Sequence, residues 1–118
     1  MQLLGFIHKP LDFSEEKLDK LSSSIESLRQ TLISAGFNCY AEQLQKIRQA
    51  SERKDSQSFR EQLNCRVLFG GFGAMWEIWI SDKILMARFE RHFRDFLDAL
   101  ERIGVRNSKI EQIKRVFY

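Results

Sequence analysis

Apolar residues recur at alternating intervals of three and four along much of this chain, a pattern typical of amphipathic α-helices. The first such stripe lies between Ser14 and Gly36 and consists of Leu18, Leu21, Ile25, Leu28, Leu32 and Ala35. Ser14 is expected to be the N-cap, with Phe13 and Leu18 placed to form a hydrophobic staple. Gly36 is expected to end this helix in a left-handed conformation.

Two shorter helices are predicted next. The second helix is expected from about Asn38 to Arg53, with Asn38 as its N-cap. The third is expected from about Ser58, because Ser58 and Glu61 have the spacing of a capping box, and it ends at the glycine cluster of residues 70–73. At least one of these glycines is expected to have a positive φ angle, because the cluster forms a tight turn.

The longest helix is predicted from about Asp82 to Ile103. Its apolar stripe consists of Leu85, Phe89, Phe93, Phe96, Leu97, Leu100 and Ile103. Gly104 follows as the C-cap residue, and a last helix is expected from Ser108 to the end of the chain. Phe93 and Phe96 are predicted to be core residues, because they lie within the stripe.

The segment from Ala74 to Ile80 is richer in Trp and Ile than its surroundings, which favours a short strand. If residues 3–7 pair with it, this segment forms a short two-stranded element near residues 75–80. The alternative is that residues 75–80 are the start of the long helix. The fold is therefore predicted to be mainly α, with about five helices in a compact bundle. At 118 residues, positions 1–118 are expected to form a single helical domain.

Charge is distributed unevenly along the chain. Residues 12–26 carry a net charge of −3, and residues 105–118 carry +3, which equals the formal charge of the whole chain. The high isoelectric point therefore comes from the last segment, which disfavours nucleic acid as a partner of the domain as a whole. No apolar run approaches the ~18 residues of a membrane span. We therefore expect a cytoplasmic protein.

Few residues are suited to catalysis or metal binding. Cys39 and Cys65 have no zinc-ligand spacing and are expected to be reduced and half-buried. His8 and His92 have no nucleophile at a recognisable spacing, and the glycine cluster lacks the Gly-Lys-Ser/Thr ending of a phosphate-binding loop. We expect no cofactor, no metal and no enzymatic activity.

Binding to another protein is the function that these residues favour. The acidic side chains predicted on the first helix are Glu15, Glu16, Asp19 and Glu26. Trp76 and Trp79 are the candidate aromatic anchors, because Trp is enriched at interface hot spots. On a strand these two positions point to opposite faces, so one ring is expected at the surface.

One stretch resembles a known pattern. Leu68-Phe69-Gly70-Gly71-Phe72-Gly73-Ala74-Met75-Trp76-Glu77-Ile78 looks like the signature of a small bacterial family of uncharacterised helical proteins, in which a Gly-Gly-x-Gly turn separates a helix from a long helix. Trp76 stands where that family tends to have Asn. In size and in the lack of an active site, the chain is similar to immunity proteins encoded beside polymorphic and contact-dependent growth-inhibition toxins.

That similarity implies a protein that binds and neutralises a cognate toxin domain, such as a nuclease, by covering its active site. The alternative is a regulatory or nucleic-acid-associated helical protein that uses the basic C-terminal helix. Lys109 and Lys114 of that helix flank its apolar stripe, so their stems would cover the core in either case.

Overall fold

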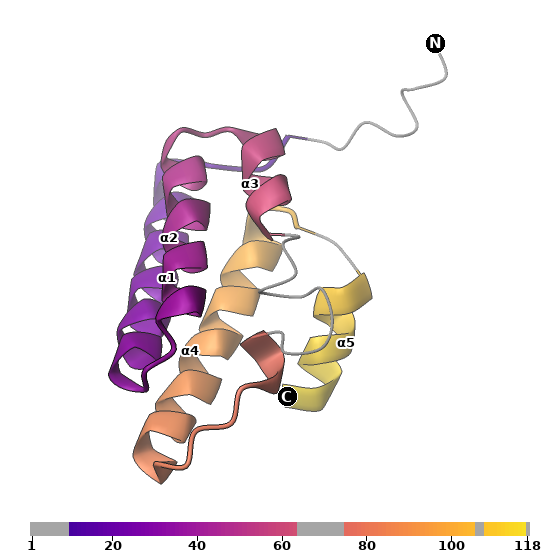
Figure 1. Cartoon of the computed structure of the whole chain (residues 1–118). Helices are drawn as coiled ribbons and strands as arrows, with labels where there is room; N and C mark the ends of the chain where they lie inside the picture. The colour runs from indigo at the N-terminus through magenta and orange to yellow at the C-terminus, as the bar shows by residue number, and fades with distance from the viewer. Residues whose placement is uncertain (1–9, 64–74, 106–107, 118) are drawn as a thin grey trace.

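The computed structural model describes residues 10–63, 75–105 and 108–117, which form five α-helices. These are α1 (Glu15–Ser34), α2 (Asn38–Glu52), α3 (Ser56–Leu63), α4 (Lys83–Arg102) and α5 (Ser108–Phe117). Figure 1 shows α1 and α2 on one side, α4 through the middle, and α5 against the far side of α4. The prediction of a mainly α bundle with about five helices is confirmed.

The two-stranded element predicted near residues 75–80 is wrong. Met75–Glu77 forms a 3₁₀ turn, η2, and residues 78–80 are irregular. Ile78 and Ile80 point into the core and Trp79 points outward, so the alternation of a strand is present. A strand also needs a partner for its backbone. Here the Ile80 N–H donates to Met86 Sδ instead, and residues 3–7 lie outside the described part.

The start of α1 is held by the side chain of Asp12 and not by that of the predicted cap. Ser14 occupies the N-cap position, but its side chain makes no capping hydrogen bond. The Asp12 carboxylate accepts a hydrogen bond from the Ser14 N–H and pairs with Lys17 at 2.7 Å. Phe13 is buried and Leu18 packs against the core, and the staple contact between them stays a prediction.

The predicted caps of α2 and α3 are wrong. Asn38 is the first residue of α2, and Phe37 occupies the N-cap position without a side-chain hydrogen bond. Helix α3 begins two residues earlier than predicted, because Asp55 Oδ1 accepts the Ser58 N–H at 3.0 Å. Ser58 therefore lies inside the first turn and cannot cap it.

Both ends of α4 agree with the prediction. Asp82 Oδ1 accepts hydrogen bonds from the N–H groups of Ile84 and Leu85. Gly104 follows the last turn with a φ of 102°, and Gly36 follows α1 with a φ of 86°. Residues with a Cβ are strained at such angles, so glycine ends both helices at low cost.

The glycine cluster at residues 70–73 and Cys65 lie outside the described residues. Cys39 is exposed, whereas it was expected to be half-buried.

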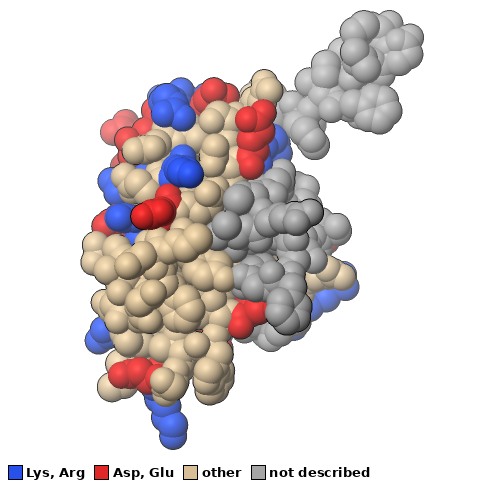
Figure 2. Space-filling view, in the orientation of Figure 1, with Lys and Arg blue, Asp and Glu red and all other residues tan. Residues whose placement is uncertain are grey.

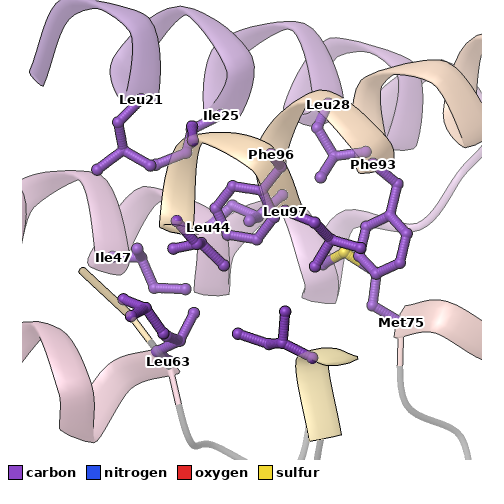
Figure 3. Packing of buried hydrophobic residues seen from close by; sticks show 14 of the residues in the cluster. Leu21, Ile25, Leu28, Leu44, Ile47, Leu63, Met75, Phe93, Phe96 and Leu97 are labelled. Carbon is purple, nitrogen blue, oxygen red and sulfur yellow. The ribbon is translucent and has the colours of Figure 1, made fainter. Parts of the chain in front are cut away.

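The core forms where α1, α2 and α3 meet the aromatic side of α4. Phe89, Phe93 and Phe96 are fully buried, and the rings of Phe89 and Phe93 stack at 5.6 Å. Figure 3 shows Leu21, Ile25 and Leu28 of α1, Leu44 and Ile47 of α2, and Leu63 and Met75 gathered around Phe93, Phe96 and Leu97. Ile110 and Ile113 of α5 are also buried.

The segment before α1 fixes how the helices are oriented. The Asp12 N–H donates to the carbonyl of Ile103, which directly follows α4, and the Leu11 N–H donates to Ser56 Oγ in α3. The start of α1 therefore lies beside the end of α4, and α1 runs antiparallel to α4 (Figure 1). As a result, the start of α1 and the start of α4 lie at opposite ends of the bundle.

Truncating Phe93 should remove a large part of the core. We expect Phe93→Ala to lower the free energy of unfolding by about 3–5 kcal/mol, because it leaves a cavity that the neighbours cannot fill. Urea unfolding followed by circular dichroism measures this loss. Ile84→Ala, on the same helix but at an exposed position, should change it by less than about 0.5 kcal/mol. Equal losses in the two variants would contradict the core assignment.

Candidate functional site

Three of the four predicted acidic residues lie at the start of α1. Glu15 and Glu16 belong to its first turn, and Asp19 follows one turn later; all three side chains are exposed. They are therefore available to a partner that carries basic side chains. Asp19 also lines a hollow that extends towards Arg102, the last residue of α4.

The fourth acidic residue, Glu26, is engaged within the molecule. Its carboxylate accepts hydrogen bonds from Arg29 at 2.7 Å, from Arg48 of α2 at 3.2 Å and from Gln30. The hydrogen bond from Gln30 and the two arginines lower the pKa of Glu26, against the opposing effect of burial. We call this set the α1–α2 clasp (Glu26, Arg29, Gln30, Arg48). Two cations balance Glu26, so it adds no free negative charge to the acidic end of α1.

Of the two tryptophans, Trp79 reaches the surface. Its side chain is 75% exposed, whereas Trp76 packs partly against the core with its Nε1 buried. Ile84, in the first turn of α4, is the other strongly exposed apolar residue near this point, at 67%. Figure 2 shows few charged side chains on the lower half of its face, over the N-terminal halves of α2 and α4.

The acidic and aromatic parts of the predicted site do not come together. Trp79 precedes the start of α4, whereas Asp19 lies near its end. A helix of 20 residues, as α4 is, is about 30 Å long. The two parts therefore form separate patches at opposite ends of the bundle.

A groove that the sequence did not reveal runs between α1 and α4. It consists of two hollows, of about 440 and 370 Å³, which meet at Ser27 and His92. The first hollow lies towards the start of α1 and is lined by charges of both signs, from Asp19, Lys20, Asp95, Asp98 and Arg102. The second lies towards the start of α4 and includes Gln30, Ser34, Leu85, Arg88 and Arg91.

Small hydroxyl side chains on α1 create the groove. Ser24 and Thr31 are buried at the α4 side of α1, and their hydroxyls donate to the carbonyls of Leu21 and Ser27 in their own helix. Because these side chains are short, they leave space between α1 and the longer side chains of α4. The Ser and Thr residues of α1 were visible in the sequence, but the helix that faces them was not.

His92 lies at the point where the two hollows meet. Partial burial, followed by the charge of Arg91, lowers the pKa of His92, while Asp95 opposes this change. The neutral imidazole is therefore favoured near pH 7. Among the described residues no hydrogen bond connects His92 to a serine or an aspartate, and no group of three metal-binding side chains is found there.

The basic C-terminal helix is partly neutralised. Lys114 of α5 forms ion pairs with Asp98, at 3.1 Å, and with Glu101 of α4. These contacts use Lys114 to attach α5 to α4, which weakens the alternative in which this helix binds phosphate groups.

None of the helices in the described part is both long enough and apolar enough to cross a membrane.

The α1–α2 clasp should make stability depend on pH. The folded-state pKa of Glu26 lies below its ordinary value of 4.5, so its stabilising effect is present above that value and is lost as the pH falls through the folded-state pKa. At pH 7, Glu26→Gln should lower the free energy of unfolding by about 1 kcal/mol. At pH 3 the difference from the wild type should be smaller.

Urea titrations at both pH values measure this difference. Glu42→Gln is the matched control, because Glu42 is an exposed acid of α2 outside the clasp. If the two substitutions had the same effect at both pH values, Glu26 would not hold α1 to α2.

Comparison with known proteins does not assign the chain to a family. No family model, no curated protein and no solved structure matches it. The resemblance of residues 68–78 to a bacterial helical family remains a prediction, and most of that stretch lies outside the described residues.

Proposed function

We propose that this chain is a bacterial immunity protein, which binds a toxin domain encoded beside it and neutralises the toxin by covering its active site. The observation that carries the proposal is the exposure of Trp79, whose side chain is 75% accessible to solvent. Trp side chains supply large contact areas and are enriched among the residues that dominate binding energy. An exposed Trp on an otherwise well-packed domain favours a protein partner.

The surroundings of Trp79 hold it in a fixed position. Ile78 and Ile80 on either side are buried, with exposed fractions of 7% and 6%. The Ile80 N–H donates to Met86 Sδ, and Asp82 caps the helix that follows. An anchor held in place before binding loses less conformational freedom when a partner covers it.

The acidic end of α1 gives the second contact. A nuclease toxin would present a basic cleft for nucleic acid, and Glu15, Glu16 and Asp19 supply exposed negative charge to match it. Opposite charges on two proteins raise the association rate more than they prolong the lifetime of the complex. The two patches therefore have different roles: the acids guide association, and Trp79 slows dissociation.

A co-expression experiment tests the proposal as a whole. The open reading frame next to this gene is expressed in cells with and without the chain, and growth is measured. We expect toxicity in its absence and normal growth in its presence. Equal death in both cases, or no toxicity from the neighbouring gene, contradicts the immunity function.

Binding kinetics test the roles of the two patches. With the purified toxin domain, Trp79→Ala should raise the dissociation rate and lower the binding free energy by about 2 kcal/mol or more, with an unchanged unfolding midpoint. Reversing Glu15, Glu16 and Asp19 to Lys should slow association, most strongly at low salt. The control reverses Glu42, Glu61 and Glu111, which are exposed acids on other helices. If the control variant slows association equally, the effect comes from net charge and not from the acids at the start of α1.

A further inference from the structure

One exposed row of side chains on α4 lies beside the groove. Ile84, Arg88 and Arg91 are spaced at i, i+4 and i+7, which places them on one face of the helix. All three are exposed. Arg88 and Arg91 line the second hollow, opposite Ser27 and Ser34 of α1. We call this end of the groove the arginine hollow (Ser27, Ser34, Arg88, Arg91). Ile84 does not line it, but it lies beside the hollow on the same face of α4.

The positive charge of the arginine hollow is not balanced from within. Among the described residues, no ion pair engages Arg88 or Arg91. Glu26 also borders this hollow, but its carboxylate is bound by Arg29 and Arg48. Two guanidinium groups therefore face a concave surface with spare hydrogen-bond donors.

We propose that the arginine hollow binds an acidic segment of a partner protein, with Asp or Glu side chains on Arg88 and Arg91 and an apolar neighbour on Ile84. The planar fork of Arg matches a carboxylate through two parallel hydrogen bonds. The hydroxyls of Ser27 and Ser34 add donors on the α1 side. The inference goes beyond the proposed function, because it uses neither Trp79 nor the acids of α1 and holds for any partner with this chemistry.

The charges along the groove favour a protein over a nucleic acid. The second hollow exposes Arg88 and Arg91 with no free carboxylate beside them, because Glu26 is bound by Arg29 and Arg48. In the first hollow the carboxylates of Asp19 and Asp95 accompany the basic Lys20 and Arg102. A nucleic acid carries a phosphate at every nucleotide, so a strand along the groove would meet these carboxylates. A peptide can place acidic residues at the arginines alone. The exposed Ile84 also suits a polypeptide better than a phosphate backbone.

Peptide titration tests the proposal with the whole chain. The probe is a fluorescein-labelled peptide of repeating Glu-Glu-Leu units, followed by anisotropy, with a Gln-Gln-Leu peptide and an oligothymidylate as comparisons. We expect the Glu peptide to bind more tightly than both, with an affinity that falls as salt rises. No binding of the Glu peptide, equal binding of the Gln peptide, or tighter binding of the oligothymidylate overturns the proposal.

Substitutions test whether the peptide binds to these arginines. Arg88→Glu with Arg91→Glu should weaken binding of the Glu peptide by about tenfold or more. The milder pair Arg88→Gln and Arg91→Gln should also weaken it, which keeps the test decisive if the reversed pair folds poorly. Lys46→Glu with Arg53→Glu is the matched control, at one exposed position on α2 and one directly after it. Equal loss in the control, or no loss in either arginine pair, shows that the peptide binds elsewhere.

Discussion

The burial of the aromatic side of α4 is the interaction on which the rest of the molecule depends. Phe89, Phe93 and Phe96 can leave water only if other helices cover them, and α1, α2 and α5 are placed accordingly. These helices cover only part of α4, and the rest of its surface remains in solvent. Ile84, Arg88 and Arg91 are exposed on that surface, so the packing of the core determines which residues of α4 a partner can reach.

Ion pairs then divide the charged residues into two groups. Glu26 joins α1 to α2, and Lys114 joins α5 to α4, so these charges hold helices together and are balanced within the fold. Glu15, Asp19 and the arginines of the second hollow lie outside such contacts. The start of α1 and the second hollow are thus two places where charge remains available outside the ion pairs that join the helices.

The sequence predicted those features that depend on neighbours along the chain. The Asp82 cap, the phenylalanine stripe of α4 and the glycines that end two helices were all predictable, because each is a local signal. The start of α3 was not, since Asp55 and Ser58 are both good caps and tertiary contacts decide between them. The Glu26–Arg48 pair and the groove also escaped prediction. They depend on how α1 is rotated against its neighbours, which no periodicity along one helix can give.

The groove between α1 and α4 differs in charge between its two ends. Near the start of α1 it is lined by charges of both signs, from Asp19, Lys20, Asp95 and Arg102, and near the start of α4 by Arg88 and Arg91 with no free carboxylate beside them. A partner segment that lay along the groove would meet mixed charge at one end and positive charge at the other. The acidic segment proposed above would therefore place its acidic residues towards the start of α4, because in the reversed direction they would meet the carboxylates of Asp19 and Asp95.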